Sequence, residues 1–154
     1  MQISLITVGR LKSGPEKQMV DDYVDRFSRL GRQLGFRGLD LIDVDSGPSL
    51  EAEGERLLAR LPAGARALRL DEHGKTMGSV ALATALGKWR DSGISDLAFL
   101  IGGADGYSQA VRAATSQTLA FGPQTWPHRL VKVMLAEQLY RAASILAGTP
   151  YHKA

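Results

Sequence analysis

The sequence predicts an α/β fold, a mostly parallel sheet with helices on both faces, in a single domain that spans residues 1–154. Five short apolar runs alternate with segments of helical periodicity along the chain, an order typical of parallel sheets. No repeat, low-complexity tract or linker interrupts that order. A chain of 154 residues with 44% hydrophobic residues can also bury a core of its own.

The expected elements follow from the local pattern of apolar residues. Runs rich in Val, Ile and Leu predict strands at 3–8, 39–44, 66–70, 97–101 and 118–121. Apolar residues at helical spacing predict helices at about 15–34, 50–61, 80–91, a short segment after Ser108, and 127–147. Pro15 fits the first turn of the first helix, and Ser108 fits the N-cap of the fourth.

The loops after the strands are the candidate ligand sites, because ligands of open parallel sheets bind beyond the carboxyl ends of the strands. These loops read GRLKSG, DSGPS, DEHGKT, GGADG and GPQTWP, and begin at residues 9, 45, 71, 102 and 122. Three of the five lie in the C-terminal half. We therefore expect the functional site in that half of the chain.

None of these loops carries a standard nucleotide-binding motif. Residues 9–14 have the spacing of a P-loop, but Pro15 and Glu16 stand where Lys and Ser or Thr are required. The segment HGKT at 73–76 lacks the leading glycine, because Arg69 occupies that position. The segment GGADG lacks the alternate glycine of the dinucleotide fingerprint. A nucleotide-binding enzyme that works by phosphate chemistry is therefore disfavoured.

Two groups of loop residues allow both a structural and a functional interpretation. Gly102, Gly103 and Gly106 permit positive φ and a close approach of a ligand to the backbone, but a tight turn into the helix capped by Ser108 is the favoured interpretation. The adjacent acids 71–72 could serve as a ribose contact or a general base. For these two acids, we favour the interpretation that they are loop residues exposed to solvent.

The start of the last helix raises the same choice. Trp126 before Pro127 is interpreted as a hydrophobic staple in preference to a base-stacking platform. His128, with no acid partner in sequence, fits a structural hydrogen bond and a catalytic role equally well.

Composition limits the remaining classes of function. Cysteine is absent and the three histidines are far apart, so neither a disulfide framework nor a metal site is expected. The first residues lack the basic lead-in and long apolar stretch of a signal peptide, which predicts a cytoplasmic protein without membrane attachment. The net charge of +3 arises within residues 121–154, which contain four basic residues and a single acidic residue, Glu137. That excess suggests a polyanionic partner, although a solvated helix face is the favoured interpretation from charge alone.

The last helix is apolar over more than one stripe. Residues 131, 134, 135 and 142 line one side, and residues 130, 133 and 140 line another. Such a helix requires two partners, which we expect to be the sheet and the same region of a second subunit. Glu137 and Arg141 are spaced for an ion pair within this helix or across a dimer.

With LRLDEHGK at 68–75, LIGGADG at 100–106 and the segment from TWPHR to PYHK at 125–153 in this order, the sequence resembles the RlmH family of SPOUT-class ribosomal RNA methyltransferases. The similarity extends over the whole chain. It implies a SPOUT methyltransferase domain over 1–154, a C-terminal trefoil knot within about 70–154, and a homodimer. It also implies S-adenosylmethionine as the methyl donor and no metal.

The resemblance assigns roles to particular residues. Cofactor binding is implied for Leu70, Gly102, Gly103, Gly106, Gly122, Pro123, Gln124, Thr125, Trp126 and Pro127. Catalytic roles are implied for His128, Tyr151 and His152, and contacts to RNA phosphates for Arg129, Lys132, Arg141 and Lys153. These assignments favour a ligand-binding role for the glycine turn.

The implied reaction is methyl transfer to N3 of a pseudouridine in the 23S rRNA of the assembled 70S ribosome. Two alternatives stay open at this point. One is a ribosome-associated RNA-binding factor of the same fold without catalysis, and the other is a SPOUT methyltransferase for another RNA, such as tRNA.

Overall fold

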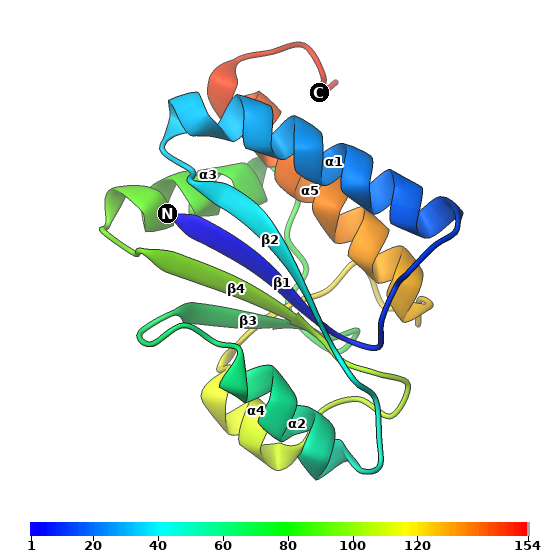
Figure 1. The fold of residues 1–154 in the computed structure, drawn as a ribbon. Coiled ribbons are helices and arrows are strands. Elements are labelled where there is room, and N and C mark those ends of the chain that lie inside the picture. Colours follow the sequence, from blue (N-terminus) through cyan, green and yellow to red (C-terminus); the bar gives the residue numbers. More distant parts are fainter. Residues whose placement is uncertain (154) are drawn as a thin grey trace.

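The computed structural model describes residues 1–153, and a five-stranded sheet lies at its centre (Figure 1). Ala154, the end of the expected domain and knot region, lies outside the described residues. The strand order is β2-β1-β4-β3-β5, and every pairing is parallel. The strands are β1 Gln2–Val8, β2 Gly38–Val44, β3 Arg66–Leu70, β4 Asp96–Ile101 and β5 Gln117–Leu119.

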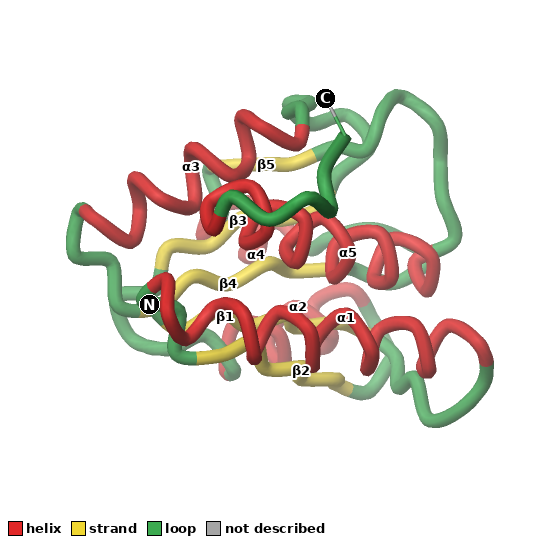
Figure 2. The backbone as a smooth tube through the Cα atoms, turned by 90° about the horizontal axis from the view of Figure 1, so that it is seen from above, coloured by secondary structure: helices red, strands yellow, loops and turns green. Residues whose placement is uncertain are grey.

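Helices cover both faces of the sheet (Figures 1 and 2). One face carries α1 Pro15–Gly31, α3 Ser79–Asp91 and α5 His128–Ala147; the other carries α2 Leu50–Ala59 and α4 Gln109–Ala114. This arrangement confirms the predicted α/β class. No helix within residues 1–153 is long and apolar enough to cross a lipid bilayer.

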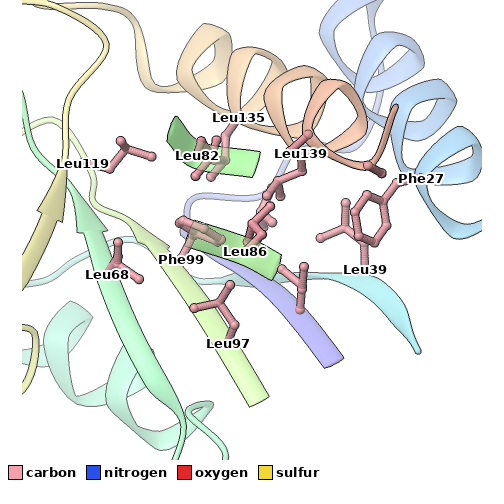
Figure 3. Close-up of a cluster of buried hydrophobic side chains, with 14 of the residues drawn as sticks. Phe27, Leu39, Leu68, Leu82, Leu86, Leu97, Phe99, Leu119, Leu135 and Leu139 are labelled. Carbon is pink, nitrogen blue, oxygen red and sulfur yellow. The ribbon is translucent and has the colours of Figure 1, made fainter. Parts of the chain in front are cut away.

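The larger core lies between the sheet and the layer of α1, α3 and α5 (Figure 3). Phe99 of β4 packs there with Leu86 of α3 and Leu139 of α5. Its neighbour Leu100 points to the opposite face, where it packs with Val111 of α4. Successive residues of a strand face opposite sides, so a central strand covered on both faces must be apolar throughout, as β4 is.

All predicted elements are present, and the differences at their ends have local causes. β5 ends at Leu119, two residues early, because its partner β3 ends at Leu70, which pairs with Leu119. The first helix divides into α1 and a 3₁₀ turn at Arg32–Leu34, where Gly35 adopts a left-handed conformation with φ of 86° and ends the turn.

The apolar sides of α5 are covered largely within the chain. Leu135 and Leu139 join the core that includes α3, and Val133 and Ala136 pack with Val20 of α1. The apolar pattern of α5 was expected to require a second subunit. Within one chain, α1 and α3 therefore cover much of α5, but Leu130 stays 40% exposed, and the homodimer stays a prediction.

Candidate functional site

A pocket of about 710 Å³ opens beyond the carboxyl ends of β3, β4 and β5. Three chain segments line it, at 70–73, 101–107 and 119–128, with additional contributions from Arg112 and Val131. Of the ten residues predicted to bind the cofactor, all but Pro123 line this pocket. Pro123 lies between two lining residues, Gly122 and Gln124.

The glycine turn after β4 combines the two interpretations that the sequence allowed. A Cβ on Gly102 would lie 2.9 Å from the carbonyl oxygen of Gly106, and Gly106 itself has a φ of +86°. Ser108 caps α4 by accepting a hydrogen bond from the backbone N–H of Val111 at 3.3 Å. The tight capped turn is therefore confirmed, and the same turn lines the pocket.

Tyr107 connects two walls of the pocket through hydrogen bonds of its hydroxyl. Its hydroxyl accepts a hydrogen bond from the N–H of Gly102 at 3.0 Å and donates to the carbonyl of Leu70 at 2.5 Å, with the carbonyl of Leu100 at 2.9 Å. Burial raises the pKa of Tyr107 well above its ordinary value, so the hydroxyl stays protonated and can donate. The sequence reasoning missed this residue, and its place directly after the glycine turn was the only available signal.

The interpretation of Asp71 as a solvated loop acid was wrong. Its side chain is only 11% exposed and accepts hydrogen bonds from Arg69 Nε at 3.3 Å and the N–H of His73 at 3.0 Å, with Arg112 at 3.7 Å. Burial acts to raise the pKa of Asp71, but these hydrogen bonds and the two guanidinium charges outweigh it and lower the pKa. Asp71 therefore fixes the loop after β3 as a charged group inside the pocket wall.

The third wall is held by side chains of the loop after β5. Thr125 donates a hydrogen bond to the carboxylate of Glu72, which joins this loop to the loop after β3. The indole N–H of Trp126 donates to the carbonyl of Phe121 at 3.1 Å. Trp126 therefore forms part of the pocket wall, a position that the hydrophobic-staple interpretation did not include.

His128 begins α5 and lines the pocket. Its Nε2 atom lies 3.7 Å from the position that a Cβ on Gly9 would occupy. The loop after β1 therefore meets the pocket at His128, although these residues are far apart in sequence.

The C-terminal tail turns back over the end of α5 and packs against it (Figure 2). The hydroxyl of Tyr151 donates to Glu137 Oε1 at 2.9 Å, and its ring meets that of Tyr140 edge to face with centroids 4.7 Å apart. Arg141 pairs with the same carboxylate and lies 3.2 Å from His152 Nδ1. Burial first, and then the hydrogen bonds of its hydroxyl, raise the pKa of Tyr151, so it stays protonated at neutral pH.

The structure does not bring the three predicted catalytic residues together. His128 lies at the first turn of α5, whereas Tyr151 folds back onto Glu137, nine residues and therefore about 14 Å further along the helix axis, and His152 lies beside Arg141. The two tail residues do not line the pocket. Within one chain, the tail and the pocket are separate features.

The predicted RNA contacts need one correction. Lys132 is only 3% exposed, and its Nζ lies 2.5 Å from Asp43 Oδ1, so it is buried in an ion pair and cannot meet a phosphate. Arg141 is partly buried against Glu137. Arg129 and Lys153 are exposed, as surface contacts require.

A second, apolar groove of about 760 Å³ lies between α1, α5 and the segment 76–79. Its lining includes Met19, Met77 and Met134. Met19 has 47% of its surface exposed. Within residues 1–153, no group of three or more His, Cys, Asp or Glu side chains is placed to hold a metal ion.

Comparison with known proteins places the chain in a class and then in a family. A family model described as a predicted SPOUT methyltransferase matches residues 1–152, which defines the class. The Ribosomal RNA large subunit methyltransferase H of Hyphomonas neptunium is 60% identical over 154 residues and 100% of both chains. The protein of the same name from Dinoroseobacter shibae is 52% identical over 155 residues and 99% of each chain. The chain belongs to the ribosomal RNA large subunit methyltransferase H family.

Among solved structures, a methyltransferase from Legionella pneumophila in complex with the bound cofactor SAM is similar to this chain with a TM-score of 0.47. The match covers 90% of this chain and 65% of that chain at 15% identity. So distant a likeness says nothing about the site.

Proposed function

We propose that the protein transfers a methyl group from S-adenosylmethionine to N3 of a pseudouridine in 23S rRNA, within the assembled 70S ribosome. The observation that carries the proposal is the pocket, because nine of the ten residues that the family resemblance assigns to cofactor binding line it. The names of the full-length relatives support large-subunit rRNA as the substrate.

The pocket fits S-adenosylmethionine in size and chemistry. Its volume of about 710 Å³ lies within the range of roughly 300–1,000 Å³ that small-molecule sites occupy. Leu70, Ile101 and Leu119 offer apolar walls for an adenine ring, and the glycine turn leaves backbone groups open to its edge. The bound cofactor would supply an electrophilic methyl group on its sulfonium sulfur.

The residues of this chain would align the methyl group and handle the proton. The N3–H of the target base must lose its proton as the methyl group is transferred, and in-line displacement requires close alignment of the reacting atoms. His128 is the candidate base because it is the one residue of the three predicted catalytic residues that lines the pocket. Tyr151 stays protonated at neutral pH, so it would hold or stack on the target base and not act as the base.

The separation of tail and pocket supports a homodimer as part of the mechanism. Because Tyr151 and His152 do not line the pocket of their own chain, a catalytic contribution from the tail would be made at the pocket of another chain. The apolar groove beside α1 and α5 and the exposed side chains of Met19, Val80 and Leu130 offer a surface for that second copy. The single domain, the trefoil knot and the cytoplasmic location belong to the same proposal.

The decisive experiment is methylation of purified 70S ribosomes with labelled S-adenosylmethionine, followed by mass mapping of the modified nucleotide. A methyl group on N3 of a 23S pseudouridine supports the proposal. Methylation of another RNA would assign a different substrate to the enzyme. Ribosome binding that is independent of the cofactor, without methylation, would favour the non-catalytic binding factor.

A further inference from the structure

We propose that the loop at residues 9–14 is an RNA-docking loop, whose exposed cations Arg10 and Lys12 bind the phosphate backbone of the RNA that enters the pocket. This proposal rests on the proposed function and adds a surface that the family resemblance did not assign. The loop follows β1, so it lies at the same edge of the sheet as the pocket.

The loop is anchored by a buried residue at its centre. Leu11 is 7% exposed and packs with Val133 and Ala136 of α5. Its backbone N–H donates to Asp43 Oδ2 at 3.1 Å, and the other oxygen of Asp43 accepts from the buried Lys132. The ion pair that removes Lys132 from the surface therefore fixes this loop against α5.

The anchored loop lies next to the pocket. Gly9 approaches the ring of His128, which lines the pocket. Arg129 follows His128 and is exposed on the first turn of α5. The loop and the start of α5 thus carry three exposed cations, at positions 10, 12 and 129, on the two segments that meet at His128.

The side chains that flank Leu11 point away from the core and remain exposed. Arg10 pairs with Asp45 at 2.7 Å, but both side chains are at least half exposed, and such surface pairs are worth little. Lys12 is exposed as well. Solvated cations on a fixed backbone can exchange water and counterions for phosphates with little further loss of backbone conformational entropy.

The chemistry of the loop favours RNA over a second copy of this chain. No large apolar side chain of the loop is exposed, and Lys12 and Ser13 are of types that are depleted in protein–protein interfaces. The apolar surface suited to a second copy lies elsewhere, in the groove lined by Met19 and Met134. A phosphodiester backbone is the partner that matches the loop.

The test uses the full chain and purified 70S ribosomes, with Lys12→Gln and the double variant Arg10→Gln/Lys12→Gln. Ribosome affinity is measured over a series of KCl concentrations at constant Mg²⁺. We expect weaker binding and a salt dependence whose logarithmic slope falls by about one for each charge removed. The affinity for S-adenosylmethionine, measured by calorimetry, should stay unchanged. Lys88→Gln, an exposed lysine near the end of α3, is the matched control.

Three outcomes would overturn the loop's role. Unchanged affinity and slope in the double variant, with wild-type binding intact, would reject the docking loop and leave the proposed function standing. A change in oligomeric mass by sedimentation would assign the loop to a contact between copies of the chain. If the wild-type protein binds S-adenosylmethionine but no ribosomes, the loop and the proposed rRNA substrate are both rejected.

Discussion

The hydroxyl of Tyr107 and the carbonyl oxygen of Leu70 lie 2.5 Å apart, so a buried side chain from the turn after β4 holds the end of β3. The same hydroxyl accepts from the N–H of Gly102. Two walls of the pocket, expected from the sequence to bind the cofactor through backbone groups, are thus set in relation to each other by one oxygen atom.

Tyr107→Phe should weaken cofactor binding by removing the hydroxyl that connects two walls of the pocket. The substitution leaves the N–H of Gly102 and the carbonyl of Leu70 without their shared partner, at a cost of about 1–2 kcal/mol in the free energy of unfolding. We expect roughly a tenfold loss of affinity for S-adenosylmethionine by calorimetry. Tyr140→Phe, which removes a hydroxyl far from the pocket, is the control. Equal losses in both variants would argue against the positioning role.

Lys132→Met should destabilise the protein by roughly 3 kcal/mol or less, because it leaves the carboxylate of Asp43 without its buried cation. Urea denaturation provides the measurement. The double variant Asp43→Asn/Lys132→Met removes both charges and should recover much of the loss, since an Asn oxygen can still accept from the N–H of Leu11. A double variant less stable than Lys132→Met would contradict this account.

Asp71 should make the stability depend on pH under acidic conditions. Its pKa is lowered in the folded state, so its contribution is complete above its unfolded pKa of about 4 and is lost as the pH falls through the lower folded value. The free energy of unfolding of the wild-type protein should therefore fall more steeply below about pH 4 than that of Asp71→Asn. Parallel curves for the two proteins, measured by urea denaturation at each pH, would refute the assignment.

Removal of the tail after Thr149 should lower methylation of 70S ribosomes by roughly two orders of magnitude while the affinity for the cofactor changes little. The reason is that Tyr151 and His152 do not line the pocket of their own chain. Tyr151→Phe, which keeps the ring on Tyr140 but loses the hydrogen bond to Glu137, should have a smaller effect. Comparable losses of methylation and cofactor affinity on truncation would reject a separate role for the tail.

His128→Gln should reduce the rate of methyl transfer by about 10²-fold or more if the imidazole takes the N3 proton. Single-turnover rates across a pH series distinguish this role from a structural one, because a general base imposes its own pH dependence on the rate. Cofactor affinity should change only slightly. A rate–pH profile of unaltered shape in the variant would remove His128 from the proton transfer.

The fold and most of the pocket could be predicted because they depend on local pattern. Apolar runs predicted the strands, and the carboxyl ends of parallel strands share one edge; the loops at 71, 102 and 122 meet there because β3, β4 and β5 are neighbours in the sheet. Ser108 could be assigned as a cap from its position alone.

The residues that sequence reasoning misjudged depend on partners distant in the chain. Lys132 was predicted to be a surface cation because nothing in the sequence shows that Asp43, 89 positions away, will pair with it. Asp71 counted as solvated because the side chain of Arg112 reaches it only in the folded structure. The roles of Tyr107 and Glu137 are likewise set by hydrogen bonds across elements or to the returning tail.

Because α5 is uninterrupted, it fixes the direction in which the tail leaves the helix relative to the pocket. Each residue of an α-helix advances the chain by about 1.5 Å along the axis and turns it by about 100° around the axis. A single-residue insertion near Ala147 would therefore swing Tyr151 to another side of the molecule while the pocket at His128 stayed intact. Natural variation in chain length should avoid this helix and accumulate in surface loops such as the one between α2 and β3.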